Sequence, residues 1–516
     1  MKKLMIVVAA ACTLPSFAQI EMATPFSDGM VLQRDREVPV WGKAAPGSEV
    51  TVRFAGNTVS AIACKGGCWK VMLPAMSASK EDRTMTVTEC EPGWFGSTTD
   101  EIEIKDVLVG EVWMCAGQSN TDCPVWGKGP RYRDGWGAMS LTSIRKPFVR
   151  LVKTPLVASE KPRYGYKATW MKMTEEMMAR FEKGERMPSA MGYYYALELA
   201  NALDIPIGLV DSSWGGTNID AWTPRSGYAG IHQLDDVAAL PVVDEKTFDG
   251  LKANGVYKDI NVCKSWIQQP TALWNGMVAA YAPMACRGFI WYQGCHNAGE
   301  YQRYAVKMHA LYNGWAKEFK NPDLKLYFVQ LTPWGNAGIA NIQMAQAKFE
   351  REEKNAGMAV INDVGNLDDI HPNDKRTVAK RLSLFALKRD YGWSQIQENA
   401  PTVKDWKVEG DKVRLTFNNT KEIYIYNADR SLDLAMEICG ADGVWKPAKV
   451  MNAKELTGKK AVGKRKFDGT LVGEGLLIAA EGVAEPKKVR YLHVAPWRGN
   501  IYSDRCLPLA SFILGE

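Results

Sequence analysis

Apolar and polar residues alternate along the first part of the chain, over residues 20–105. Val38–Gly42 and Ser48–Phe54 show this pattern, and Pro-Gly and Gly-Asn turns separate the runs. A period of two predicts strands that bury one face. We therefore expect a small N-terminal β-sandwich-like domain over residues 19–105.

From Asp106 the pattern changes, because short continuous apolar runs now alternate with helical patterns. The apolar runs are Val107–Val109, Ile207–Val210, Gly288–Tyr292 and Leu326–Val329. The helical patterns are Met191–Ala202, Tyr304–Phe319 and Lys375–Tyr391. Strands that alternate with helices predict an α/β fold with a doubly wound parallel sheet, here over residues 106–398. Ligands bind beyond the carboxyl ends of such strands, so the residues that follow each run are the first candidates for a site.

Beyond Pro401 the period of two returns. Lys412–Phe417, Glu422–Tyr426 and Val489–Val494 are the clearest runs. They predict a C-terminal β-sandwich-like domain over residues 399–516. The chain has no fixed-period repeat and no low-complexity segment.

The N-terminus has the pattern of an export signal. Lys2 and Lys3 precede an apolar stretch, Leu4–Leu14, and Ser16–Ala18 is a small-x-small cleavage site. We therefore expect residues 1–18 to be a signal peptide and the mature protein to be secreted or periplasmic. Lipidation at Cys12 is the less favoured alternative, because it would leave an abnormally short apolar region. No later segment reaches about 20 uninterrupted apolar residues, so no stable membrane insertion is expected.

Charge and cysteine content narrow the function further. The chain has 64 basic and 58 acidic residues. Removing residues 1–18 leaves 62 basic and 58 acidic residues, so the net charge falls from +6 to +4. These charges are well mixed, which gives no support to nucleic-acid binding. Ten cysteines remain after Cys12, and Cys64 and Cys68, which flank a Gly-Gly turn, are expected to form a disulfide. Cys115, Cys123, Cys286 and Cys295 all lie near the candidate site described next.

Four polar segments follow predicted strands. The first contains Ser119, whose hydroxyl can act as a nucleophile once a base removes its proton. The second contains paired glycines that end at Gly216, where backbone N–H groups can approach a ligand. The third offers the amides of Gln293 and Asn297, which can stabilise a developing negative charge. The fourth contains His371. Each segment alone has an ordinary structural explanation as a turn, a packed strand or a helix cap.

The histidines identify the candidate base, because the chain has only five. His309 and His493 fall within a predicted helix and a predicted strand, and His232 falls in a polar loop. Of the remaining two, His296 and His371, only His371 has carboxylates at a spacing typical of a catalytic triad. The sequence therefore favours His371 as the general base.

Taken together, these segments resemble a known family. The ordered set Gly-Gln-Ser-Asn, Ser-Ser-Trp-Gly-Gly-Thr, Trp-Tyr-Gln-Gly and Asp-Ile-His-Pro is similar to the sialate O-acetylesterase family of SGNH-type hydrolases. The resemblance extends to Pro25–Arg34 and Leu273–Met277, so it covers nearly the whole mature chain. It implies an SGNH-hydrolase-like core with Ser119 as nucleophile and His371 as base. The implied oxyanion hole consists of the N–H groups of Ser119 and Gly216 with an amide of Gln293 or Asn297. Neither a cofactor nor a metal is implied.

The acid that orients His371 is left open between two neighbours. Asp368, three residues before the histidine, has the spacing typical of SGNH hydrolases, whereas Asp369, two before, matches the more usual family aspartate. Adjacent residues of an extended loop point in opposite directions, so we expect only one of them to serve the imidazole. From the spacing we predict that Asp368→Asn slows catalysis more than Asp369→Asn.

The chain departs from the family pattern at two places. Cys295 and His296 replace the usual Glu-Ser of the Trp-Tyr-Gln-Gly segment, which can alter turnover or preference. Thr121 replaces a common methionine, for which we expect a local packing effect.

The expected reaction is hydrolysis of O-acetyl esters on sugars, with O-acetylated sialic acids as the favoured substrates. A sialic acid carries a carboxylate, which an arginine can bind. Of Arg131, Arg133, Arg225 and Arg303 we favour Arg225, because it follows the Gly216 loop directly. Gln118 and Trp214, which lie beside the nucleophile and the glycines, are further candidates for substrate binding.

Three other functions stay open. One is an acetylesterase acting on hemicellulose, since the same chemistry serves any sugar acetate. Another is a non-catalytic glycan-binding protein, for which the altered Cys295-His296 pair would mark a decayed site. The third is a metal site built from Asp363, Asp368, Asp369 and His371, although the turn glycine of a calcium loop is missing. The oligomeric state is not predicted.

Overall fold

The structure is a computed structural model of the chain. It describes residues 20–93, 96–125, 146–166, 169–173, 177, 179–180, 183–256, 263–334, 337–366, 369–426, 434–451, 461–462, 465–466, 470–493 and 498–515. The expected signal peptide, Arg131, Arg133 and Asp368 lie outside these residues.

The N-terminal strands form two antiparallel groups. β1 (Glu21–Met22), β3 (Val38–Lys43) and β6 (Cys68–Leu73) form a three-stranded sheet. β4 (Glu49–Phe54), β5 (Asn57–Ile62) and β7 (Ser79–Gly93) pair with one another and with the first half of β8 (Gly96–Gly117). Buried and exposed residues alternate along β6, as the period of two predicted.

β8 continues from the N-terminal strands into the centre of the molecule. It pairs antiparallel with β7 as far as Val109, and from Glu111 it pairs in parallel with β11 (Ile207–Ser213). A short strand, β2 (Val31–Gln33), lies parallel to β8 at the transition. The boundary that the change of pattern predicted after residue 105 therefore falls inside one continuous strand. The hydrophobic pattern could not reveal this, because it records which faces are buried and not which strand is the partner.

The central sheet has the order β10-β9-β11-β8-β12-β13-β14. β10 (Met171–Met173) is antiparallel to β9 (Lys146–Lys153), whereas β9, β11, β8, β12 (Gly288–Tyr292), β13 (Lys325–Val329) and β14 (Ala356–Ala359) run in parallel. Every residue of β11, β12 and β14 is buried, as expected for strands covered on both faces.

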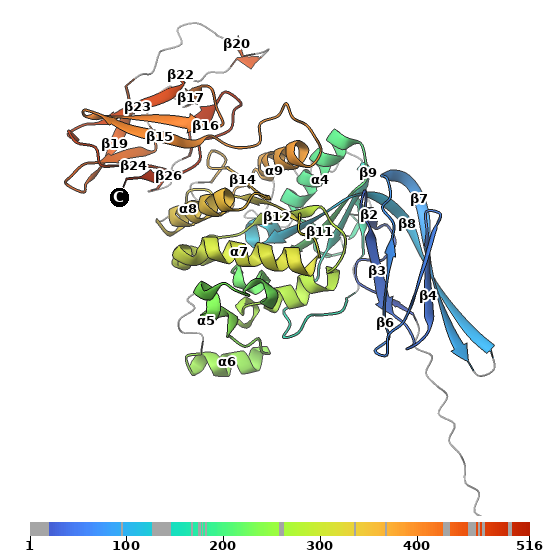
Figure 1. The fold of residues 1–516 in the computed structure, drawn as a ribbon. Helices are drawn as coiled ribbons and strands as arrows, with labels where there is room; N and C mark the ends of the chain where they lie inside the picture. The colour runs from blue at the N-terminus through green and yellow to red at the C-terminus, as the bar shows by residue number, and fades with distance from the viewer. Residues whose placement is uncertain are drawn as a thin grey trace, which may run out of the picture.

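Helices cover both faces of this sheet (Figure 1). α4 (Ala190–Leu203) and α9 (Lys375–Arg389) pack against each other on one face. α7 (Tyr301–Glu318) and α8 (Ala337–Glu352) lie side by side on the other. The bounds of α4, α7 and α9 are close to those of the three helices that the sequence predicted, whereas α8 was not predicted. The alternation of strands and helices in a mixed α/β fold is thus confirmed.

The remaining helical segments are short. They are α1 (Ser119–Asp122), α5 (Asp235–Ala238), α6 (Glu245–Ala253) and the turns η1 (Asp220–Trp222), η2 (Arg225–Gly227), η3 (His232–Leu234), η4 (Trp266–Gln268), η5 (Trp274–Val278), η6 (Ala279–Tyr281) and η7 (Cys295–Glu300). Most of them lie in the segments that follow β8, β11 and β12, where the site was expected.

The C-terminal part is built from strands, as predicted. Seven strands form one antiparallel sheet: β15 (Thr402–Glu409), β16 (Lys412–Asn418), β23 (Gly475–Ala480), β19 (Trp445–Val450), β18 (Met436–Cys439), β24 (Lys488–Tyr491) and β26 (Phe512–Leu514). β22 (Thr470–Gly473), β17 (Ile423–Ile425) and β25 (Ile501–Ser503) form a second sheet, and β20 (Ala461–Val462) pairs with β21 (Arg465–Lys466). Apolar residues of both larger sheets share one core, separate from the core of the α/β region.

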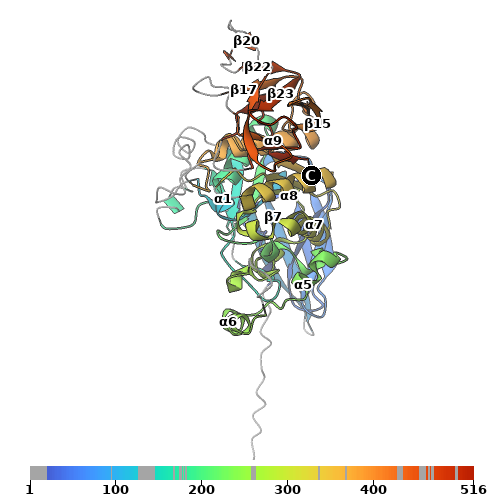
Figure 2. The same cartoon turned by 90° about the vertical axis from the view of Figure 1, so that its left-hand side faces the viewer.

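The two sets of β strands lie on opposite sides of the α/β region. Figure 1 places the N-terminal strands at the right and the C-terminal strands at the upper left, and Figure 2 shows the C-terminal strands above α9. The C-terminal part is attached by hydrogen bonds: the Asn362 side chain donates to the Leu509 carbonyl over 2.7 Å, and the Gly499 N–H donates to the Asn362 carbonyl over 3.0 Å.

The expected disulfide is not formed. All ten cysteines that follow Cys12 are described, and none of them, including Cys64 and Cys68, forms a disulfide. The Cys64 N–H donates to the Cys68 carbonyl over 2.9 Å, so backbone hydrogen bonds already close this turn. Among the helices that the structure describes, none has the length and apolar character to cross a bilayer.

Candidate active site

Three neighbouring strands end at the same level of the central sheet. Gly117 at the end of β8 is in register with Ser213 of β11 on one side and with Tyr292 of β12 on the other. The segments that follow these strands therefore meet, as expected at the carboxyl edge of a parallel sheet. They are three of the four segments that the sequence singled out.

The nucleophile segment turns sharply after β8. Gly117 has a φ of 143°, and a Cβ there would lie 2.4 Å from both the Thr121 hydroxyl and the Tyr292 carbonyl, so only glycine fits. Ser119 follows as the first residue of α1 and is half-buried. The Thr121 hydroxyl donates to the Tyr292 carbonyl over 2.9 Å. This residue therefore fastens α1 to the end of β12, in keeping with the local packing effect expected of it.

Ser119, His371 and Asp369 form a hydrogen-bonded chain. The Ser119 Oγ lies 3.0 Å from His371 Nε2, and His371 Nδ1 lies 2.7 Å from Asp369 Oδ1. With Nδ1–H donating to the carboxylate, Nε2 is free of a proton and can accept the serine hydroxyl proton. This is the arrangement of a nucleophile, its general base and an orienting acid.

Among the described residues the contact with His371 Nδ1 comes from Asp369, so we propose Asp369 as the orienting acid and Asp368 stays an untested alternative. Asp369 Oδ1 accepts the backbone N–H of His371 at 3.0 Å as well as its Nδ1. Aspartate commonly accepts a hydrogen bond from the N–H two residues further along, and this turn brings its carboxylate next to the imidazole. Asp368 lies outside the described residues.

Asn120 fixes the histidine loop to the nucleophile helix. Its side-chain nitrogen donates to the Ile370 carbonyl over 3.1 Å, and its side-chain oxygen accepts from the buried Lys375 over 2.6 Å. Asp374 caps α9 by accepting the Thr377 N–H at 2.9 Å. Neither Asn120 nor Lys375 was expected to have this role, although Asn120 belongs to the Gly-Gln-Ser-Asn motif.

The paired glycines lie directly against the nucleophile. A Cβ on Gly215 would lie 3.5 Å from the Ser119 Cβ, and Gly216 has a φ of 73°, which favours glycine. The Trp214 N–H donates to the Gly117 carbonyl over 3.1 Å, so half-buried Trp214 anchors this loop to the end of β8. Within the described part of the chain, the N–H groups of Ser119 and Gly216 donate to no acceptor. Both therefore remain available to an oxyanion.

The two candidate amides have different roles. Gln293 is fully engaged, since its Nε2 donates to the Thr217 carbonyl and to Asn297 Oδ1, and its Oε1 accepts from Tyr304. Asn297 Oδ1 accepts from Gln293 at 2.8 Å and from the Ile219 N–H at 3.1 Å. These two donors fix the orientation of the Asn297 amide and leave its Nδ2 as the group available for a further hydrogen bond.

Asn297 Nδ2 is the unusual atom of the site. It is buried and has no hydrogen-bond partner among the described residues. Leaving such a donor unsatisfied costs about 1–3 kcal/mol, so it is rarely kept without a ligand. Asn297, oriented by Gln293, is therefore the candidate amide donor, which separates two residues that the sequence left as alternatives.

A buried lysine connects the two loops that carry these donors. Lys307 on α7 contacts Asp220 at 2.8 Å and Glu300 at 2.5 Å, and Lys307 and Asp220 are each 1% exposed. Burial alone would lower the pKa of Lys307, but the two carboxylates outweigh it and hold that pKa above its usual value. Asp220 follows the glycine loop and Glu300 follows Asn297, so this triad holds the loops together. The sequence analysis missed it, because ion pairs distant in sequence leave no local pattern.

We expect Lys307→Met to lower the free energy of unfolding by about 3–5 kcal/mol, because it leaves two carboxylates buried without their cation. Urea unfolding followed by tryptophan fluorescence measures this loss. Lys317→Met, on the exposed side of the same helix, is the matched control and should change the free energy by less than about 0.5 kcal/mol. Equal effects of the two substitutions would show that the triad does not stabilise the fold.

The residues proposed to bind substrate are not all at the site. Arg225 donates to the carbonyls of Ala238 and Leu240, which ties η2 to the segment after α5. Arg303 is likewise engaged, with Asp236. The expectation that Arg225 reads a substrate carboxylate is therefore not supported, because its guanidinium binds backbone instead. The position of Arg225 close to the glycine loop in sequence could not reveal the direction of its side chain.

The Gln118 side chain connects two loops of the site by hydrogen bonds and is not directed at a substrate. Its side-chain oxygen accepts the N–H groups of Gly294 at 3.1 Å and His296 at 3.5 Å. It thereby connects the nucleophile turn to the loop that carries Gln293 and Asn297. Trp214, the other proposed substrate residue, lies in the loop whose Gly215 is next to Ser119.

The structure gives little support to two competing chemistries, a cysteine nucleophile and a metal site. Burial raises the pKa of the Cys295 thiol to about 12, so it stays protonated at neutral pH and is a poor nucleophile. Asp363 binds Arg381 through both carboxylate oxygens at 2.6 and 2.7 Å, which removes it from the metal site considered above. No cluster of metal-ligating side chains occurs among the described residues. His309 and His232 contact Glu352 and Asp235, away from Ser119.

Comparison with known proteins shows a similarity to carbohydrate acetylesterases over most of the chain. Residues 260–414, which include Asn297 and His371, match the family model described as "Carbohydrate esterase, sialic acid-specific acetylesterase". The chain is 27% identical to the sialate O-acetylesterase of Rattus norvegicus over 78% of this chain and 79% of that protein. It is 27% identical to the Homo sapiens sialate O-acetylesterase, over 80% of this chain and 78% of that protein. The crystal structure of a carbohydrate acetylesterase from Xanthomonas citri matches with a TM-score of 0.75 and 27% identity, covering 96% of this chain and 99% of that one.

Proposed function

Since the chain belongs to the sialate O-acetylesterase family of carbohydrate esterases, we propose that it hydrolyses sugar acetates by a serine mechanism, with O-acetylated sialic acids as its substrates. The observation that carries the proposal is the chain of Ser119, His371 and Asp369 beside the unpartnered Asn297 amide. We assign the α/β region to the SGNH-type hydrolases and the flanking strands to β-sandwich-like domains. We also keep residues 1–18 as a proposed export signal.

The first half of the reaction transfers the acetyl group to the enzyme. His371 Nε2 takes the proton of Ser119 Oγ as the oxygen attacks the ester carbonyl. The negative charge that develops on the carbonyl oxygen is stabilised by the N–H groups of Ser119 and Gly216 and by Asn297 Nδ2. When the tetrahedral intermediate collapses, His371 returns the proton to the departing sugar oxygen. The products are the free sugar hydroxyl and an acetyl-serine.

The second half regenerates the serine. His371 takes a proton from a water molecule, which attacks the acetyl-serine carbonyl, and the same donors stabilise the second tetrahedral intermediate. Collapse returns the proton to Ser119 Oγ and releases acetate. Asp369 holds the imidazole in one tautomer throughout and stabilises its charged form.

We expect Asn297→Ala to lower kcat by about 100- to 1,000-fold with little change in KM, because the lost hydrogen bond forms mainly in the transition state. Steady-state hydrolysis of p-nitrophenyl acetate measures both constants. Asn313→Ala on the exposed side of α7 is the matched control and should keep the wild-type kcat. An unchanged kcat in Asn297→Ala would remove this residue from the oxyanion hole.

The substrate class is tested by direct comparison. The kcat/KM for acetate release from an O-acetylated sialic acid is measured beside that from an acetylated xyloside, with p-nitrophenyl acetate as the reference ester. A clear preference for the sialic acid supports the proposal, whereas comparable values favour a general acetylesterase that accepts hemicellulose sugars. If the purified protein releases no acetate from any of the three, the non-catalytic glycan-binding alternative is favoured.

A further inference from the structure

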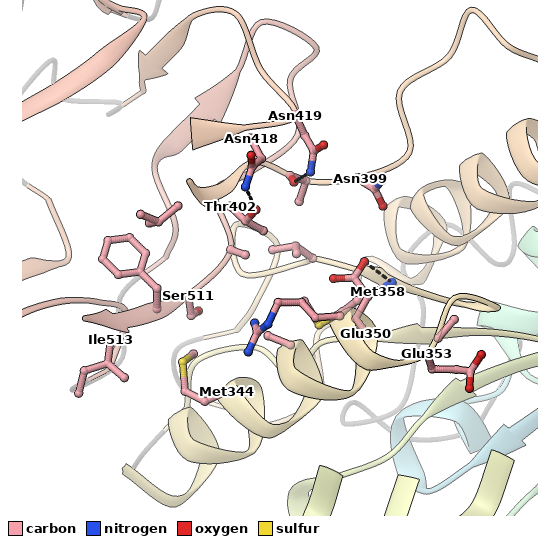
Figure 3. A pocket seen from close by; sticks show the side chains of 18 of the residues that line it. Met344, Glu350, Glu353, Met358, Asn399, Thr402, Asn418, Asn419, Ser511 and Ile513 are labelled. Atoms are coloured by element: carbon pink, nitrogen blue, oxygen red, sulfur yellow. Dashed lines mark hydrogen bonds between the residues drawn. The ribbon is translucent and has the colours of Figure 1, made fainter. Parts of the chain in front are cut away.

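A second cavity lies away from the site, between α8, β14 and the C-terminal strands. Its volume is about 880 Å³, which is within the range of roughly 300–1,000 Å³ typical of sites for small ligands. Figure 3 shows α8 with Met344 at its base, Asn418 and Asn419 above, and Ser511 and Ile513 at one side. Two parts of the chain that are distant in sequence thus form its opposite walls.

The walls are fixed by specific hydrogen bonds. The Asn419 side chain donates to the Ala400 carbonyl over 3.0 Å, and the Ala510 N–H donates to the Pro401 carbonyl over 3.0 Å. Arg389 on α9 donates to the Ala356 carbonyl of β14 over 2.6 Å and to Asn399 over 3.0 Å. These contacts connect α9, β14 and the start of the C-terminal strands, so the shape of the cavity is built into the fold.

The lining offers polar groups that the protein itself does not use. Among the described residues, the side-chain oxygens of Asn418 and Asn419 accept no hydrogen bond, and Arg351 and Lys354 form neither an ion pair nor a side-chain hydrogen bond. The Ser511 hydroxyl is buried in the wall without a partner. The two asparagines, Arg351 and Lys354 are exposed, so they can bind either water or a ligand. The Ser511 hydroxyl is a buried unsatisfied group of the kind expected where water or a ligand is bound.

The cavity also contains apolar and acidic groups. Met344, Phe512 and Ile513 line it, and Ile513 is 42% exposed. Glu350 accepts the Met358 N–H at 3.4 Å, and burial raises the pKa of its carboxyl group. Apolar surfaces interspersed with amides, a carboxyl group and cations suit a sugar, whose hydroxyls need donors and acceptors while its C–H faces need apolar contact. The mixed charge does not suit a polyanion such as nucleic acid.

We propose that this cavity is a second saccharide-binding site, which holds a part of the glycan distant from the acetyl ester. The choice of a saccharide as ligand rests on the proposed function. β14 contributes Ala356 and Met358 to the cavity and Val360 follows directly, and the chain continues from Val360 through Asp363 to the loop of Asp369 and His371. Binding at the second site raises the effective concentration of the ester at Ser119, so it lowers KM for an acetylated oligosaccharide and leaves kcat unchanged.

The test measures binding and hydrolysis separately. Isothermal titration calorimetry of the full chain uses two unacetylated probes, sialyllactose as an acidic trisaccharide and xylotriose as a neutral one. We expect at least one probe to bind and Ala347→Trp, which fills the cavity from α8, to weaken that binding at least about tenfold. A double variant, Arg351→Ala with Asn418→Ala, removes two polar ligands without touching the core and should have the same direction of effect. Lys348→Ala, exposed on the same helix and outside the cavity, is the matched control.

Each outcome decides the proposal. Probe binding that weakens in both cavity variants but not in the control supports it, and which probe binds shows whether the site takes acidic or neutral sugars. If neither probe binds at millimolar concentration, or if the cavity variants bind as well as the wild type, the cavity is only a water-filled gap. Hydrolysis of p-nitrophenyl acetate, which is too small to need the cavity, should stay within about twofold of wild type in every variant. Loss of esterase activity with intact probe binding would refute the proposed function and leave the second site standing.

Discussion

Replacing Ser119 by alanine should lower kcat for acetyl ester hydrolysis by about a million-fold, because the substitution removes the atom that attacks the ester. The fold should persist, since Ser119 is half-buried and its side-chain hydrogen bond is to His371. Acetate release and p-nitrophenol release both measure the effect, and the far-ultraviolet circular dichroism spectrum checks the fold.

The neighbouring serine that lies outside the proposed chemistry provides the control. Ser213 at the end of β11 hydrogen-bonds to Asp211 and Asp122, and Ser213→Ala should retain far more activity than Ser119→Ala. Near-normal turnover in Ser119→Ala would exclude this residue as the nucleophile. A covalent acetyl group on Ser119, detected by mass spectrometry after rapid acid quenching, would establish it independently.

Asp369→Asn should lower kcat by about ten-thousand-fold. An asparagine amide at this position can donate to Nδ1, which would leave the proton on Nε2 and remove the acceptor for the serine hydroxyl. Steady-state kinetics with p-nitrophenyl acetate measure the change. KM should be affected much less than kcat, because the side chain at position 369 orients His371 and does not bind the substrate.

Asp368→Asn is the informative comparison for that prediction, because it makes the same chemical change one residue earlier. The 2.7 Å contact between Asp369 and His371 leads us to expect the larger loss in Asp369→Asn, the reverse of the order that residue spacing suggested. A larger loss in Asp368→Asn would contradict the orienting role of Asp369 and restore the spacing argument.

Sequence pattern predicted the parts of the molecule that depend on local periodicity. The alternation before Asp106 and after Pro401 indicated strands, and α4, α7 and α9 fall close to the three helical patterns. The sequence also proposed Ser119 and His371 as a pair, because each lies just after a strand or before a helix in a short motif, and the structure places them 3.0 Å apart. A parallel sheet brings such segments together whatever the details of their side chains.

The sequence pattern could not predict the directions in which side chains point. Asp368 and Asp369 differ by one position, and only the backbone turn at His371 determines which carboxylate meets the imidazole. Arg225 lies near the glycine loop in sequence, yet its guanidinium binds carbonyls after α5. Gln293 and Asn297 offer the same functional group, and their roles differ because Tyr304 and Thr217 occupy one of them. Each of these outcomes depends on a contact with a residue far away in the chain.

The course of β8 has a consequence for how this enzyme can be divided. Its first half pairs with β7, and its second half ends just before Ser119 at the carboxyl ends of the central strands. Removing the N-terminal strands would therefore strip hydrogen-bond partners from the strand that carries the nucleophile, and would leave an open edge able to pair with other molecules. The N-terminal region is thus not a removable module, and evolution could exchange it for another only by preserving the strand that both parts share.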